Sequence, residues 1–135
     1  MLGWVTMAST ILIVSLLVIA FLFIQLLPFI KARELQGKDI PDLSDVLDEK
    51  HRQQQKLLIY FWSPRCSMCR SMTPVIEKLA QQRDDVVSIN AAENVEAARR
   101  LKVMGTPTLV VLNKGKIEQV LLGAKSEKTI NGLLN

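Results

Sequence analysis

Two cysteines, Cys66 and Cys69, are the residues whose type and spacing most clearly indicate chemistry, and they are the only cysteines in this chain of 135 residues. They follow a short apolar run at 57–62 and stand where a helical pattern begins. Side chains three residues apart on a helix lie on the same side, so the two sulfur atoms can meet. The N-terminus of a helix favours a thiolate at Cys66, and Arg65 and Arg70 add positive charge on either side. This spacing predicts a reactive, reversibly oxidised dithiol.

Three other interpretations of the cysteine pair are weaker. A zinc site normally needs four ligands, whereas the chain offers two cysteines and one distant histidine, His51, so zinc would require a second chain. A purely structural disulfide would close a loop too short to constrain the unfolded chain much. Two inert buried thiols are the third interpretation, since free cysteine is among the most buried residue types. We therefore expect a redox dithiol without metal or cofactor, and a solvent-exposed His51.

The N-terminal segment differs from the rest of the chain. Residues 1–30 carry no charged side chain, and 11–27 is a nearly continuous run of Ile, Leu, Val and Phe. About 20 apolar residues suffice to cross a bilayer. A secretory signal peptide would have a positive n-region, a shorter apolar run and a small-residue cleavage site, and a core helix would have a polar face. The pattern predicts one uncleaved membrane helix at 6–30, with Trp4 at one interface and Pro28 near the other.

The charge lies entirely after this segment. Lys and Arg exceed Asp and Glu by 17 to 13, giving a net charge of +4 that is spread over residues 31–135. No long basic run and few aromatic residues accompany it, so nucleic-acid binding is not expected. Lys31, Arg33 and Lys38 flank only the C-terminal end of the apolar helix, which predicts a cytoplasmic location for the domain after it. Long domains can be translocated despite such charges, so an extracytoplasmic location is the alternative.

The remaining sequence predicts a polar juxtamembrane linker at 31–42 and then one domain at 43–135. Apolar runs of strand length alternate with helical patterns, and Asn113–Lys116 has the composition of a hairpin turn. This order of elements favours a mixed sheet with helices on both faces. The predicted strands are 57–62, 86–90, 108–113 and 117–122, and the predicted helices are 43–54, 66–82 with Pro74 inside it, 93–101, and 126–134 capped by Ser126.

This layout resembles the thioredoxin family from about Leu57 to the end of the chain. The residues that carry the resemblance are Phe61-Trp62, Cys66-x-x-Cys69, Pro74 and Gly105-Thr106-Pro107-Thr108, with Gly115 and Gly123 at two further positions where the family keeps glycine. The resemblance implies an α/β thioredoxin fold for this domain, and the apolar segment predicts one N-terminal transmembrane anchor, residues 1–30, before it. The resemblance also implies the activity of a thiol–disulfide oxidoreductase.

The resemblance also implies roles for individual residues. Cys66 would attack a protein disulfide as a thiolate, and Cys69 would then attack Cys66 and release the reduced substrate. The bond before Pro107 would be cis, and the proline would pack against the dithiol. The residues that would bind the substrate chain are Trp62, Arg65, Thr106, Pro107 and Gly123.

Several positions depart from the family pattern. Tyr60 and Ser88 occupy the positions where thioredoxins keep a buried Asp and its Lys partner, which help to deprotonate the second cysteine. Arg65 replaces the usual Trp, and Ser67-Met68 replaces the usual Gly-Pro. General acid–base assistance is typically worth about 10²–10⁴-fold, so its loss predicts slower resolution by Cys69 at neutral pH. A narrower range of substrates near the membrane is expected.

The sequence thus favours a membrane-tethered thiol–disulfide oxidoreductase that uses its dithiol to reduce or exchange protein disulfides. Its expected partners are protein substrates with disulfides or thiols, an electron donor that the sequence does not identify, and the lipid bilayer through residues 6–30. One alternative is a thioredoxin-fold binding or scaffold module of a membrane complex with an incidental dithiol. A specialised reductase for an apocytochrome or a metallochaperone is a third, and it requires the extracytoplasmic location.

Overall fold

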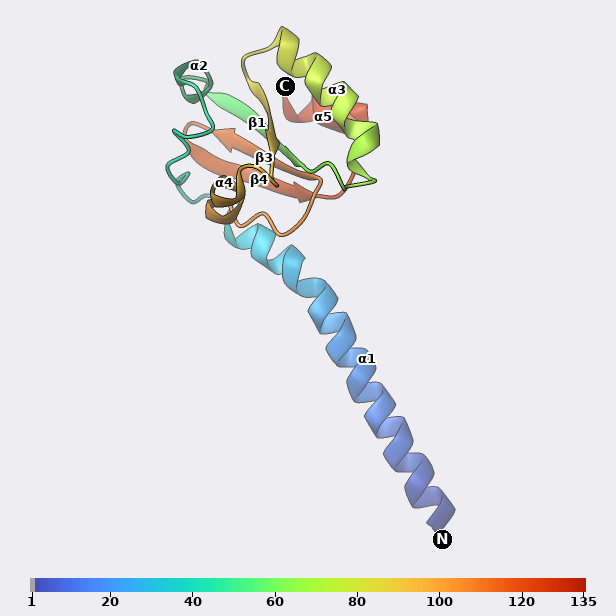
Figure 1. The fold of residues 1–135 in the computed structure, drawn as a ribbon. Helices are drawn as coiled ribbons and strands as arrows, with labels where there is room; N and C mark the ends of the chain where they lie inside the picture. The colour runs from blue at the N-terminus through green and yellow to red at the C-terminus, as the bar shows by residue number, and fades with distance from the viewer. Residues whose placement is uncertain (1) are drawn as a thin grey trace. The chain divides into compact units, whose positions relative to one another are not determined.

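The computed structural model describes the backbone of residues 2–135 and the side chains of residues 8–27, 30 and 35–135 (Figure 1). The chain forms two compact units, residues 1–31 and 32–135. The side chains of Trp4, Pro28, Lys31 and Arg33, on which the predicted membrane interfaces and orientation depend, lie outside the described residues.

The first unit is almost entirely helix α1 (Leu2–Glu34). Its segment Ala8–Leu27 has a mean hydropathy of 2.9, and none of it is buried within the protein. The hydroxyl of Ser15 donates a hydrogen bond to the carbonyl of Ile11 at 2.8 Å, so this polar group is satisfied within the helix itself. By length and composition the helix can span a bilayer.

The second unit is built around one four-stranded sheet. Its strands are β1 (Lys56–Trp62), β2 (Val86–Asn90), β3 (Thr108–Asn113) and β4 (Lys116–Leu122), in the order β2-β1-β3-β4. β1 pairs with β2 in parallel, and the other two pairings are antiparallel. All five central residues of β1 are buried, as expected for a continuous apolar strand in the middle of a sheet.

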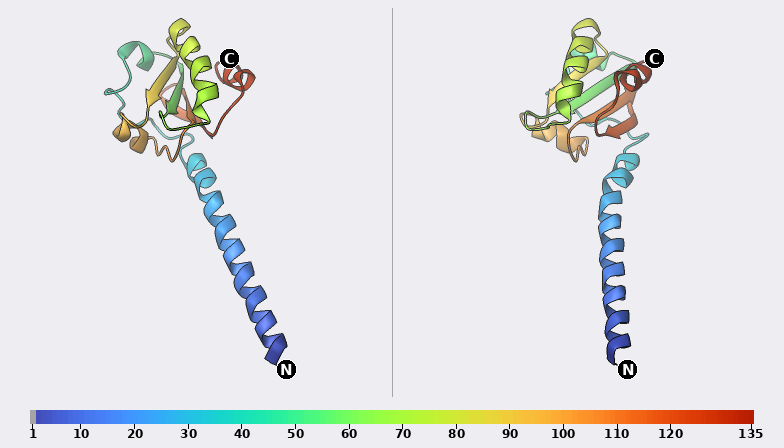
Figure 2. Two further views of the ribbon diagram at one scale, coloured as in Figure 1. Left: turned by 45° about the vertical axis from the view of Figure 1, so that its right-hand side comes forward. Right: turned by 90° about the vertical axis from the view of Figure 1, so that its right-hand side faces the viewer.

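Helices cover both faces of the sheet (Figures 1 and 2). α3 (Cys69–Gln82) and α5 (Glu127–Leu133) pack on one face, where Met72, Ile76 and Ile130 meet Leu58 and Tyr60 of β1. α4 (Val95–Arg100) packs on the other face, against Ile59 and Phe61. Successive residues of β1 therefore supply two separate cores. The predicted mixed sheet with helices on both faces is confirmed.

The segment before β1 differs from the prediction of a helix at 43–54. Only α2 (Glu49–Arg52) is helical, and residues 44–46 form a turn closed by hydrogen bonds to the carbonyl of Leu43. The carboxylate of Asp42 accepts the backbone N–H of Ser44 at 3.0 Å, a local contact that competes with helix formation. Leu43 and Leu47 are nevertheless buried, because one turn places both side chains toward the core.

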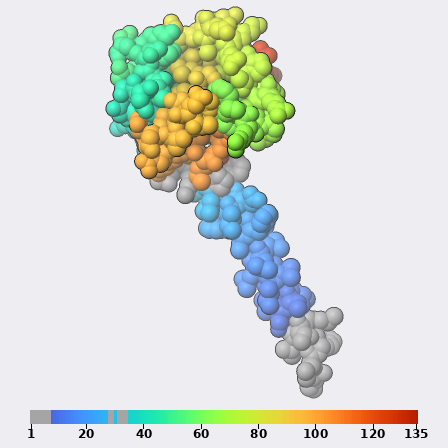
Figure 3. Space-filling model, viewed as in Figure 1, coloured from blue at the N-terminus to red at the C-terminus, as the bar shows by residue number. Residues whose placement is uncertain are grey.

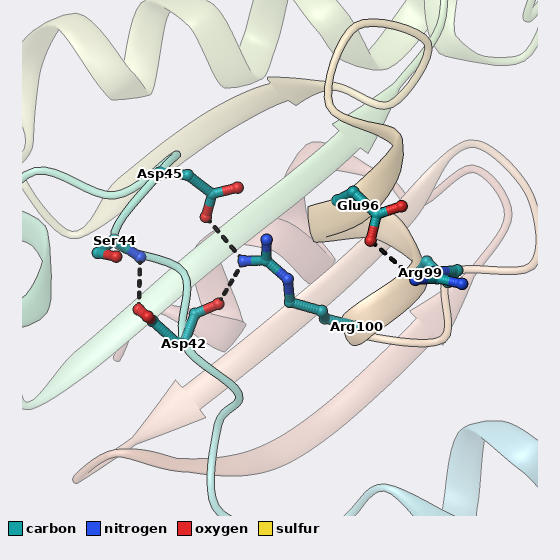
Figure 4. A network of polar contacts seen from close by, with 6 residues as sticks. All are labelled: Asp42, Ser44, Asp45, Glu96, Arg99 and Arg100. Atoms are coloured by element: carbon teal, nitrogen blue, oxygen red, sulfur yellow. Dashed lines mark hydrogen bonds and ion pairs between the residues drawn. The ribbon is translucent and has the colours of Figure 1, made fainter.

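An arginine of α4 anchors this segment (Figure 4). Arg100 donates from one guanidinium nitrogen to the carbonyl of Asp42 at 2.6 Å and to the carboxylate of Asp45 at 2.9 Å. Hydrogen bonds from the backbone N–H and the hydroxyl of Ser44 hold the pKa of Asp42 below its ordinary value. The segment is thus tied to the sheet through α4.

Part of the predicted linker is also folded. Leu35 is only 5% exposed and belongs to the same core as Leu43. Residues 37–40 lie along the β3–β4 hairpin, where Gly37 donates to the carbonyl of Ile117 at 2.7 Å and Ile117 donates to that of Lys38 at 3.0 Å. This pairing covers one end of the edge strand β4.

Smaller differences concern the ends of the elements. β1 and β4 each begin one residue earlier than predicted, while α4 and α5 are shorter than the predicted helices 93–101 and 126–134. Ser126 caps α5 as predicted, because its hydroxyl accepts the N–H of Thr129. The hairpin turn uses positive φ at Lys114 and Gly115, which suits a two-residue connection between antiparallel strands.

Candidate active site

The two cysteines lie where β1 gives way to α3. The predicted helix 66–82 was wrong at its start, because α3 begins at Cys69 and Cys66 lies in the preceding turn. The N–H of Cys66 bonds to the carbonyl of Ser63 at 3.1 Å, and the N–H of Cys69 bonds to that of Cys66 at 3.2 Å. These tight i to i+3 turns lead into the helix and keep both sulfur atoms at its N-terminal end.

Cys66 and Cys69 form a disulfide, with 5.3 Å between their Cα atoms. The sulfur of Cys66 also accepts the backbone N–H of Cys69 at 3.1 Å. Cys69 is 2% exposed, whereas Cys66 is partly exposed. Cys66 is therefore the more accessible of the two cysteines, and the N–H beside its sulfur can stabilise negative charge there after reduction.

Tyr60 occupies the core behind the second cysteine. It is fully buried, and it pairs with Ser88 across the β1–β2 ladder. Its hydroxyl lies 2.9 Å from that of Thr73 and approaches the carbonyl of Cys69 at 3.5 Å. Burial raises the pKa of Tyr60 and the charge of Glu77 adds to this, against the hydrogen bond with Thr73. The phenol is therefore neutral at physiological pH and cannot replace a carboxylate as a base.

Thr73 was not among the predicted site residues. It lies four residues after Cys69, so both side chains belong to the same side of α3. That spacing is the only sequence signal for it, because a lone threonine in a helix has no distinctive pattern. Thr73 belongs to the site because its hydroxyl contacts that of Tyr60, and Tyr60 comes from a different element, β1.

The loop before β3 is joined to the dithiol turn. The Thr106–Pro107 bond is cis, as predicted. The hydroxyl of Ser63, three residues before Cys66, lies 3.2 Å from that of Thr106. Gly123, whose φ of 80° favours glycine, donates its N–H to the carbonyl of Pro107 at 2.9 Å. Three segments far apart in the sequence thus meet at one end of the sheet.

A hollow of about 290 Å³ opens beside the disulfide. Trp62, both cysteines and Arg70 line it, so the structure places Trp62 beside the dithiol. Arg65, Thr106, Pro107 and Gly123 do not line it. The predicted substrate-binding residues are therefore not all in one place. Trp62 lies in the hollow, whereas Thr106, Pro107 and Gly123 lie in the segments that are linked to the dithiol turn through Ser63. The described residues that line the hollow are Trp62, Ser63, Pro64, Cys66, Cys69, Arg70, Thr73 and Pro74.

His51 differs from its predicted environment. It is only partly exposed, and its Nδ1 atom is buried without a hydrogen-bond partner. Leu47 and Leu57 lie around it, at the opposite end of β1 from Trp62. Among the residues that the structure describes, no group of three or more His, Cys, Asp or Glu side chains could hold a metal ion.

Comparison with known proteins agrees with this geometry. The thioredoxin family model matches residues 43–135. Thioredoxin of Bacillus subtilis is 37% identical over 82 residues, which are 58% of this chain and 79% of that protein. Thioredoxin of Listeria monocytogenes is 24% identical over 99 residues, which are 71% of this chain and 96% of that protein.

Solved structures give the same result. A mutant thioredoxin from Halobacterium salinarum superposes with a TM-score of 0.56 at 31% identity, over 73% of this chain and 83% of its own. Oxidised mitochondrial thioredoxin 3 from Saccharomyces cerevisiae superposes with a TM-score of 0.52 at 30% identity, over 61% of this chain and 79% of its own. With its matching domain and its two cysteines joined as a disulfide, the chain belongs to the thioredoxin family of thiol–disulfide oxidoreductases.

Proposed function

We propose that this chain is a membrane-tethered protein-disulfide reductase in which Cys66 is the attacking thiol and Cys69 the resolving thiol. The observation that carries the assignment is the difference between the two cysteines in exposure and in hydrogen bonding. Cys66 is partly exposed and its sulfur accepts an N–H at 3.1 Å, whereas Cys69 is 2% exposed. Only one of the two thiols combines access with stabilisation of its thiolate.

The reaction proceeds by two exchanges. The Cys66 thiolate attacks one sulfur of a substrate disulfide, and the other substrate sulfur leaves as a thiolate that takes up a proton. Cys69 then loses its proton and attacks Cys66, which closes the Cys66–Cys69 disulfide and releases the second substrate thiol. Two electrons pass to the substrate, and an external dithiol donor must return them. Trp62, Thr106, Pro107 and Gly123 would hold the substrate chain as a short added strand.

The apolar helix supports the tether. Ala8–Leu27 has the length and hydropathy of a bilayer-spanning segment. Positive charges at Lys31, Arg33 and Lys38 follow it, and residues 1–7 on its other side carry no charged side chain. We assign the catalytic unit to the cytoplasmic face on this asymmetry. In that compartment a cellular dithiol pool keeps Cys66 and Cys69 reduced.

Labelling of a single cysteine in intact cells tests the tether and its orientation. The chain is produced as a C66S/C69S variant with Gln81→Cys, which is exposed on α3. We expect a membrane-impermeant maleimide to label this cysteine only after lysis, and alkaline carbonate to leave the protein in the membrane fraction. The matched control, Gly3→Cys in the same background, should be labelled on intact cells.

Two results would reject parts of the assignment separately. Labelling of Gln81→Cys on intact cells, with Gly3→Cys protected, would place the catalytic unit outside the cytoplasm and favour the specialised extracytoplasmic reductase. Release of the protein by carbonate would reject the tether itself, while leaving the assignment of the two cysteines untouched.

A further inference from the structure

The two arginines beside the dithiol differ from the other described arginines. Each of the others forms an ion pair with a carboxylate: Arg52 with Glu49, Arg83 with Asp85, Arg99 with Glu96 and Arg100 with Asp45. Arg65 and Arg70 are exposed and form no ion pair with any carboxylate in the described part of the chain. Their positive charge is therefore available to a molecule that approaches Cys66.

These arginines belong to a surface made by three segments, residues 63–70, 103–107 and 122–126, which we call the dithiol surface. Hydrogen bonds hold the segments together. Ser63 contacts Thr106 at 3.2 Å, and Gly123 donates to Pro107 at 2.9 Å. Figure 3 shows the green segment that contains the dithiol beside the orange segment that precedes Pro107. A substrate bound at Cys66 would meet this surface as a whole.

The dithiol surface carries charge of one sign. Its three segments contain Arg65, Arg70 and Lys125 and no aspartate or glutamate. Among the described residues that line the hollow beside the disulfide, Arg70 alone is charged. Cations clustered on one surface without carboxylates attract anionic groups over a distance comparable to the Debye length.

The charge changes sign on the other side of Trp62. A second hollow, of about 420 Å³, is lined by Trp62 together with Glu77 and Glu93, and no described residue that lines it is cationic. A carboxylate on a bound substrate is thus attracted toward Arg65 and Arg70 and repelled from this second hollow. The contrast would fix the direction in which an acidic segment lies across the dithiol.

We propose that Arg65 and Arg70 select substrates whose reactive disulfide is flanked by Asp or Glu. The proposal rests on the proposed function, because it concerns the same attack by Cys66 on a substrate disulfide. A guanidinium group binds a carboxylate through two parallel hydrogen bonds, and unpaired arginines retain this capacity for a partner. The partner is therefore an acidic protein segment containing a disulfide.

Competition between charged peptide disulfides tests this selection. The full-length chain is reduced with dithiothreitol in non-ionic detergent, freed of reductant and mixed with peptides whose single cysteine is joined to 5-thio-2-nitrobenzoate. Attack by Cys66 forms a Cys66–peptide disulfide and releases the coloured thiolate, which reports the rate. The peptides differ only in their flanking residues, which are Glu, Ser or Lys.

We expect the Glu-flanked peptide to react about tenfold faster than the Lys-flanked peptide at low salt. The ratio should fall toward one at about 1 M salt, where the Debye length is about 3 Å. R65E/R70E should invert the ratio. The matched control K78E/K128E makes the same change in net charge on helices α3 and α5 and should keep the wild-type ratio. Because every peptide reacts with the same thiolate, any effect of the arginines on Cys66 itself cancels in the ratio.

A Glu-to-Lys rate ratio at or below one in the wild type would overturn the selection, and so would an equal loss of the ratio in both double variants. Loss of the ratio in bilayer discs containing anionic lipid, but not in discs of neutral lipid, would assign the arginines to lipid headgroups and also overturn it. If Cys66 attacks the Ser-flanked peptide no faster than the thiol of glutathione does, the proposed function is rejected instead. The two failures are therefore distinguishable.

Discussion

The Cys69→Ser variant is expected to accumulate a mixed disulfide between Cys66 and its substrate. In the wild type Cys69 lies three residues away and attacks within the same molecule. Well-oriented intramolecular reactions reach effective concentrations of about 10⁵–10⁸ M. External thiols at millimolar concentration release the adduct several orders of magnitude more slowly. Non-reducing gels and mass spectrometry of the purified full chain measure the adduct and the cysteine that carries it.

Cys66→Ser is the matched control for this experiment. Its remaining thiol, Cys69, is 2% exposed, so reaction requires local opening of the first turn of α3. An opening that costs about 4 kcal/mol leaves on the order of one molecule in 10³ reactive. We expect almost no adduct from this variant. Recovery of the same species in equal amounts from both variants would show that the two roles are wrongly assigned.

The double substitution Tyr60→Asp with Ser88→Lys is expected to speed the attack of Cys69 on Cys66 by about 10²-fold near neutral pH, at the low end of general acid–base assistance. The two positions face each other directly in the β1–β2 ladder, so an introduced carboxylate and ammonium group can interact. The neutral Tyr60 phenol cannot accept the proton that Cys69 must lose, whereas an aspartate can. The rate is read from the release of 5-thio-2-nitrobenzoate preloaded on Cys66, as a function of pH.

This substitution also carries a cost in stability. Removing a fully buried aromatic ring typically costs about 3–5 kcal/mol, and desolvation of the new ion pair adds to that cost. Tyr60→Phe is the matched control, because it retains the ring but loses the hydrogen bond with Thr73. It should leave the pH dependence of resolution unchanged. If the double variant is folded by circular dichroism and resolves at the wild-type rate, resolution does not depend on this site.

The sheet and the dithiol were predictable because their signals are local. Residues 57–62 are a continuous apolar run and 108–113 contain another at 109–112, and runs of this length favour strands buried on both faces. The spacing of Cys66 and Cys69 after such a strand indicates the dithiol without any tertiary information. The cis bond before Pro107 followed from the family resemblance, and the structure has it.

The features that the sequence analysis missed depend on tertiary contacts. Leu43 and Leu47 have the spacing of a helix, but a single turn is enough to bury both side chains. Arg100 of α4 holds this turn in place through hydrogen bonds that the sequence does not reveal. Leu35 lies in a segment whose polar composition predicts a linker. The segment is folded because the residues after Leu35 form backbone hydrogen bonds with the β3–β4 hairpin. The contact between Thr73 and the dithiol site likewise could not be predicted, because it is made through the buried hydroxyl of Tyr60, which β1 places against α3.

The most direct test of the central claim is the rate at which Cys66 of the reduced, full-length chain reacts with iodoacetamide at pH 7, with glutathione as the reference thiol. An ordinary thiol is only a few per cent ionised at that pH, so a thiolate stabilised by the Cys69 N–H should react on the order of tenfold faster. We predict this acceleration at Cys66 and little modification of Cys69, as located by mass spectrometry. A rate at Cys66 no greater than that of glutathione would contradict the account and favour a scaffold with an incidental dithiol.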